Sequence, residues 1–181
     1  SLVVLSSEEN KLWFSFLSRE KEYQKELTAF EKEVDYFRDR QEGADSLLEE
    51  DEIEEFKRKA SESANQFNQL QMEREMFITG LTGEQKDLFA VKMIETFREP
   101  FRDGYLSSDE RRKFFKKDFF RDVNFSDLSL INSPVLTDKV FDFLVTYNQK
   151  GFTKEQREQA YIEAVKVIME NVGQVSGEGE Q

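Results

Sequence analysis

The chain has 181 residues, of which 38% are hydrophobic and 13% are aromatic, including 18 Phe. So many large apolar side chains exclude a disordered chain, and a compact domain of this length can remove about 70% of its unfolded surface from water. The chain contains only eight Gly and two Pro. These are few turn residues for a protein with many strands, so the composition favours long helices.

The charge balance and two missing residue types exclude several functions. The net charge of -12 repels phosphate backbones and anionic headgroups, so we expect neither nucleic acid nor a membrane surface as a partner. The chain has no Cys and no His. Disulfides, thiolate chemistry, zinc sites with these ligands and imidazole catalysis are therefore excluded. We expect no catalytic residue, no cofactor and no metal.

A first long helix is predicted over residues 7–43. Its apolar residues recur in alternating steps of three and four, which is typical of a helical seam, with one gap at Glu20. Ser6 followed by Glu9 is a capping-box signature, and Gly43 supplies a stop. The seam consists of Trp13, Phe16, Tyr23, Leu27, Phe30, Val34 and Phe37.

A second seam begins after the acidic run 49–52 and closes near Gly80. Because only a few residues join two helices of similar length, we predict an antiparallel hairpin over 7–80 within one chain. A homodimer that exchanges these helices is the alternative. The small residues at the centre of the second helix are expected to face bulky side chains of the first. These small residues are Ala60, Ser63 and Ala64.

Four shorter helices are predicted between residues 82 and 172. Their start signals are Thr82 with Gln85, Ser107 with Glu110, Ser133 with Pro134, and Thr153 with Gln156. Pro100 ends or kinks the first of them, and a turn at Lys150-Gly151 would make the last two a second hairpin. The residues expected to face the core are Phe89, Met93, Phe97, Phe114, Phe115, Phe119, Phe120, Leu136, Val140, Phe143, Leu144, Tyr147, Tyr161, Ala164, Val165, Ile168 and Val172.

The predicted fold is therefore all-α: a long antiparallel helical hairpin packed against a cluster of about four shorter helices. We expect a single domain over 3–173. Residues 1–2 have the look of a cloning remnant, and residues 174–181 read as a flexible linker.

The acidic run from Glu49 to Glu55 invites a metal-binding interpretation. A calcium loop, however, alternates its ligands around a Gly, whereas these residues open a helix, where the helix dipole favours negative charge. We favour the structural interpretation. Trp13 has two interpretations as well, as an exposed anchor for a partner or as a core residue, and its place in the first seam favours the core.

Two segments have the look of interaction surfaces. Residues 111–117 interleave basic and aromatic side chains, which indicates either a docking patch or an amphipathic helix with its rings inward; the net charge favours the helix. Residues 118–127 interleave acidic and aromatic side chains, which suits a rigid brace between helices or a ridge that faces a partner. The candidate surface residues are Arg111, Arg112, Lys116, Lys117, Asp122 and Asp127.

Several short segments of the sequence resemble segments of a known protein family. They are the run Phe119 to Asp127, Leu130, Ser133 to Leu136, Lys139-Val140 and Phe143-Leu144, together with the opening Ser7 to Leu12. They resemble the helical region that precedes the thioredoxin-like domain in envelope-bound thiol-disulfide oxidoreductases of Gram-negative anaerobes. Asn124 and Ser133 depart from the aspartate and threonine usual there. The resemblance spans about Val3 to Val172.

The resemblance implies which segments and domains flank this region in the parent protein, and it implies no active-site residue within the chain. It implies a signal peptide or lipid anchor and a β-rich domain upstream, and a thioredoxin fold with a redox Cys pair downstream. We therefore expect a non-catalytic helical domain of a periplasmic, cell-envelope thiol-disulfide oxidoreductase or isomerase, which spaces or presents a redox domain absent from this chain. The alternative is a free-standing helical adaptor that binds partner helices or peptides. An enzyme would need a deep pocket with two convergent, unpaired carboxylates.

Overall fold

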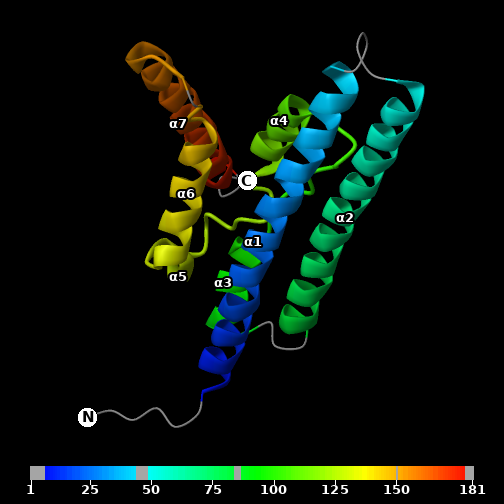
Figure 1. Cartoon of the computed structure of the whole chain (residues 1–181). Helices are drawn as coiled ribbons and strands as arrows, with labels where there is room; N and C mark the ends of the chain where they lie inside the picture. The colour runs from blue at the N-terminus through cyan, green and yellow to red at the C-terminus, as the bar shows by residue number, and fades with distance from the viewer. Residues whose placement is uncertain (1–6, 44–48, 84–86, 150, 178–181) are drawn as a thin grey trace.

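The computed structural model describes residues 7–43, 49–83, 87–149 and 151–177, and these residues form helices without a strand. The predicted all-α fold is confirmed, with one helix more than expected because Leu128–Ile131 forms a single turn of its own. The helices are α1 (Glu8–Gly43), α2 (Glu50–Thr82), α3 (Phe89–Thr96), α4 (Ser108–Asp118), α5 (Leu128–Ile131), α6 (Pro134–Thr146) and α7 (Lys154–Gly177) (Figure 1).

The predicted hairpin is present: α1 and α2 run antiparallel along most of their lengths, and the shorter helices gather on one side of them (Figure 1). Where the two helices meet, their apolar seams form a core of buried residues. This core contains Tyr23, Leu27, Val34, Phe67 and Leu70. The second helix closes near Gly80, as predicted, and its last residue is Thr82; one exposed Gly inside the helix costs only about 1 kcal/mol.

The start of α1 differs from the predicted capping box. Ser7, rather than Ser6, accepts a hydrogen bond at Oγ from the backbone N–H of Asn10 (3.3 Å), and Ser6 lies outside the described residues. Glu9, the other predicted member of the box, is used elsewhere, because its carboxylate reaches a different helix.

That helix is α3, whose first amides have no side-chain cap from its own N-cap residue, Leu88. The carboxylate of Glu9 accepts hydrogen bonds from the backbone N–H groups of Phe89 (3.0 Å) and Ala90 (2.6 Å). The predicted N-cap, Thr82, is instead the last residue of α2. A carboxylate from another helix thus supplies both the hydrogen-bond acceptor and the negative charge that an N-terminus favours.

The remaining start signals are confirmed in most respects. Ser107 and Glu110 form a complete capping box at α4, and Thr153 Oγ1 accepts from the backbone N–H of Gln156 (3.2 Å) at α7. Ser133 is the N-cap residue of α6 and Pro134 is its first helical residue, as predicted, but the Ser133 side chain makes no capping hydrogen bond. Its hydroxyl donates to the carbonyl of Leu130 (2.7 Å).

A second core joins α4, α6 and α7 around Phe119, Phe120, Phe143 and Ala164. Four residues that were predicted to face the core are exposed instead: Phe114 (47%), Val165 (48%), Tyr161 (39%) and Val172 (39%). The aromatic pattern predicted that a ring of α4 would face the core, but the side chain of α4 that is buried there is Arg111, which is 2% exposed. Trp13 packs against Phe16 and Phe97, in agreement with its core interpretation.

The small residues of α2 have a neighbour that the pattern did not predict. A Cβ on Gly104, in the connection between α3 and α4, would lie 2.8 Å from the carbonyl oxygen of Ala64. Gly104 must therefore lack a Cβ for this connection to lie against the backbone of α2. At the other end of the chain, α7 includes residues 174–177, which were assigned to the linker; residues 1–2 and 178–181 lie outside the described residues.

Candidate functional site

Glu20, which interrupts the apolar seam of α1, is one member of a buried ion pair. The Arg74 guanidinium of α2 donates from Nε to Glu20 Oε2 (2.9 Å) and from Nη2 to Glu20 Oε1 (3.0 Å), and also to the carbonyl of Phe97 (2.9 Å). Burial opposes the charged guanidinium, but the hydrogen bonds and charge of Glu20 hold the pKa of Arg74 above its ordinary value. The polar residue in the apolar seam is thus explained by its partner on the facing helix.

Further arginines join the hairpin to the chain beyond it. Arg102 pairs with Glu31 of α1 (3.2 Å) and Glu99 (3.5 Å). Arg111 donates to Asp35 of α1 and to the carbonyl of Leu106 (2.7 Å). These charges are committed to packing within the molecule.

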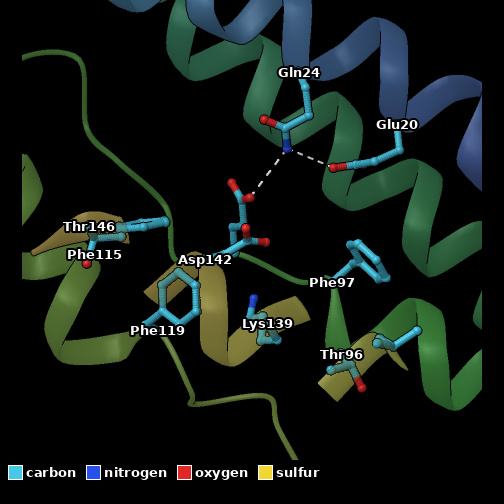
Figure 2. Close-up of a pocket in the computed structure, with 11 residues that line it drawn as sticks. Glu20, Gln24, Thr96, Phe97, Phe115, Phe119, Lys139, Asp142 and Thr146 are labelled. Carbon is cyan, nitrogen blue, oxygen red and sulfur yellow. Dashed lines mark hydrogen bonds between the residues drawn. The ribbon is translucent and has the colours of Figure 1, made fainter. Parts of the chain in front are cut away.

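A cavity of about 380 Å³ lies beside this ion-pair network, between α1, α3, α4 and α6 (Figure 2). One part of its wall is aromatic and aliphatic, and the other part carries acids, an amide, hydroxyls and one lysine. The lining residues are Glu20, Gln24, Thr96, Phe97, Glu99, Phe115, Phe119, Val135, Lys139, Asp142 and Thr146.

Lys139 is the buried cation of this cavity, with 6% of its surface exposed. Its Nζ donates to the carbonyl of Arg98 (2.7 Å) and lies 4.4 Å from the ring centre of Phe119. Among the described residues, no carboxylate oxygen comes within 4 Å of this Nζ. Burial lowers the pKa of Lys139 to about 8, opposed by the charge of Glu99.

The carboxylates of the cavity differ in whether they have a bonding partner. Glu20 is held by Arg74, and Gln24 Nε2 donates to both Glu20 (2.8 Å) and Glu99 (3.4 Å) (Figure 2). Asp142 lies at the solvent-exposed rim and, within the described part of the chain, has neither an ion pair nor a hydrogen bond. Partial burial raises its pKa. One unpaired acid does not make the convergent pair that carboxylate-only catalysis needs.

The six candidate surface residues have different surroundings. The Arg111 side chain is buried and is not available to a partner. Arg112 pairs with Asp109 (3.4 Å), whereas Lys117 is exposed. Lys116 lies with Nζ 3.8 Å from the ring centre of Tyr147, and burial lowers its pKa.

The two acidic candidates lie beyond α4. Asp122 is exposed and pairs with Arg121 (3.4 Å). Asp127 pairs with Lys92 of α3 (2.7 Å) and also accepts from the backbone N–H of Ser129 (2.9 Å). These bonds, led by the one from Lys92, lower the pKa of Asp127 to about 2. Asp127 therefore acts in packing.

The acidic-aromatic segment matches its interpretation as a brace. Phe119 and Phe120 are buried against Phe143, while Asn124 Oδ1 accepts from the backbone N–H of Ser126 (2.9 Å). Short polar side chains satisfy the backbone and the rings fill the core, as the segment's composition predicts.

An apolar groove of about 410 Å³ between α5, α6 and α7 was not predicted from the sequence. Its exposed members include Ile131 (49%) and Phe141 (62%). Beside it, α7 exposes Ile162, Val165 and Met169, which share a face at helical spacing. The groove is lined by Phe125, Ile131, Leu136, Thr137, Val140, Phe141, Leu144, Ile168 and Val172.

The acidic run opens α2, where Glu49 and Glu52 form a capping box. Among the described residues, no group of three or more acidic side chains could hold a metal ion. None of the helices described is both long and apolar enough to cross a membrane. No protein-family model, curated protein or solved structure matches the chain.

Proposed function

We propose that this chain is a non-catalytic helical domain of a periplasmic thiol-disulfide oxidoreductase or isomerase, and that it spaces or presents the thioredoxin-like domain of that protein. The support from the sequence is the set of segments between residues 119 and 144 that resemble the helical region of that family. In the fold these segments form the brace after α4 and the body of α6.

The observation that carries the proposal is the exposed apolar surface of α6 and α7. Phe141 and Val145 on α6 are 62% and 65% exposed, and Met169 on α7 is 64% exposed. Apolar side chains gathered next to a groove mark an interaction surface more often than isolated ones do. A domain that holds a neighbour in place needs such a surface, whereas its charged interior supplies rigidity.

The experiment uses the full-length protein. Met169→Lys and Phe141→Lys place a charge on the apolar surface, and Met76→Lys, at a 66% exposed position on α2, is the matched control. We expect the two α6–α7 variants, and not the control, to increase hydrogen exchange at the interface of the redox domain and to change its rate of disulfide exchange. Equal behaviour of all three variants would contradict the proposal.

The groove supports a second candidate, a free-standing adaptor. An apolar groove between helices is the usual site for the apolar face of a partner helix. Under this alternative the gene encodes no redox domain, and the isolated chain binds an amphipathic helical peptide in solution.

A further inference from the structure

The cavity beneath α1 carries two complementary charges that form no ion pair among the described residues, the buried amine of Lys139 and the carboxylate of Asp142 at the solvent-exposed rim. Lys139 is 6% exposed and has one hydrogen bond, to a neutral carbonyl, while Asp142, one turn later on α6, has no bonded partner among the described residues. Figure 2 shows the Lys139 amine pointing into the cavity. A buried charge without a bonded counter-charge is costly, so proteins usually pair it, and this cost applies to Lys139.

The neighbouring charges do not supply that pairing. Glu20 already binds Arg74 through both oxygens, and Glu99 is shared between Arg102 and Gln24. Opposite these polar groups, Phe97, Phe119 and Val135 form an apolar wall. The cavity therefore offers a cation, an anion and an apolar surface together.

From this arrangement we infer that the cavity is a binding site for a small zwitterion, namely a free α-amino acid with an apolar side chain. Its carboxylate would pair with Lys139 and its ammonium with Asp142, while the side chain would lie against Phe97 and Phe119. A volume of about 380 Å³ lies at the lower end of the range of small-ligand pockets, about 300–1,000 Å³. This site is separate from the α6–α7 surface and does not depend on the role proposed for that surface.

The probe is L-leucine, titrated into the isotope-labelled chain and followed by the backbone amide resonances of α3 and α6. Two truncated probes test each charge: 4-methylpentanoate lacks the amine, and 3-methylbutylamine lacks the carboxylate. Loss of one charge-assisted contact is expected to weaken binding roughly 10- to 100-fold. Lys139→Met and Asp142→Asn should weaken leucine binding similarly.

Two exposed residues provide matched controls. Lys166→Met on α7 and Asp138→Asn on α6 make the same chemical changes outside the cavity, and both should leave leucine binding unchanged. Saturable shifts that are confined to the cavity and lost in Lys139→Met would support the inference.

Three results would overturn it. The first is no saturable shift at about 10 mM leucine, ten times a millimolar Kd. The second is undiminished binding to Lys139→Met. The third is 4-methylpentanoate binding as tightly as leucine, which would make the cavity a simple anion site.

Discussion

Arg74 and Glu20 form a two-pronged ion pair across the α1–α2 interface, with Nε to Oε2 at 2.9 Å and Nη2 to Oε1 at 3.0 Å. Both side chains are nearly inaccessible, at 5% and 11% exposure. The pair replaces an apolar contact in the seam of the hairpin and also binds the end of α3. It therefore connects the hairpin to the wall of the cavity.

Removing one member of this pair should be worse than removing both. Arg74→Met leaves the Glu20 carboxylate buried and uncompensated, so we expect a loss of about 3–5 kcal/mol in the free energy of unfolding. The double variant Arg74→Met/Glu20→Met should recover most of that loss. Urea denaturation of the single and double variants measures the difference, and additive losses would contradict the account.

Gly104 should not tolerate a methyl group. In Gly104→Ala the new Cβ would lie 2.8 Å from the Ala64 oxygen and 2.9 Å from its Cα. Because both are backbone atoms of α2, relief requires a shift of the connection, and we expect a loss of about 1–3 kcal/mol. Gly80→Ala is the control, since nothing lies within 4 Å of its new Cβ; it should gain about 0.5–1 kcal/mol. Thermal unfolding of both variants tests the pair, and a neutral Gly104→Ala would refute the tight contact.

Glu9 lies on α1 but should stabilise α3 by capping its N-terminus. Glu9→Ala removes the acceptor for the amides of Phe89 and Ala90, so we expect a loss of about 0.5–2 kcal/mol, the usual range for an N-cap. Hydrogen exchange should accelerate at those two amides. Glu33→Ala, an exposed change on the same helix, should do neither. Unchanged protection of Phe89 and Ala90 would show that another group caps α3.

Lys139 should make the fold more stable as the pH rises above 8. Its pKa falls from 10.5 to about 8 on folding, so between these values the unfolded chain binds more protons than the folded one, and stability increases with pH. The gain should reach about 2 kcal/mol near pH 9.5.

Three other groups set the conditions of that measurement. Lys116, with a lowered pKa, acts in the same direction, whereas burial raises the pKa values of Tyr23 and Tyr147 and so lowers stability above pH 10. Chemical denaturation between about pH 7 and 9.5 should therefore compare the wild-type chain with Lys139→Met, for which we expect a flatter pH profile and greater stability at pH 7. Parallel profiles would contradict the burial of a charged Lys139.

The hairpin could be predicted because its signal is local: two apolar seams of helical period joined by a short connection. Two caps, at Ser107 and Thr153, were equally local. The cap from Glu9 could not be predicted, since its partner lies about eighty positions away. The same holds for Arg74, whose need for a counter-charge shows only as a break in the seam at Glu20.

The cavity and the groove could not be predicted from the sequence, because they exist only once the helices have packed together. Lys139 looks in the sequence like any helix-surface lysine, and only the packing of α6 against α3 and α4 buries it. Phe114 shows the converse error, because a ring beside Phe115 was assigned to the core while the inward position belongs to Arg111. Hydrophobicity alone misplaces long cationic side chains, which can bury their stems and pair their heads.

The proposed role is tested most directly by determining the gene sequence on both sides of this chain, in particular the roughly 150 codons that would follow Gln181, about one domain in length. We predict a Cys-x-x-Cys motif in a strand-helix setting there, which would make this domain the helical arm of a thiol-disulfide oxidoreductase. A stop codon directly after Gln181 would contradict the proposal and leave the adaptor as the better account.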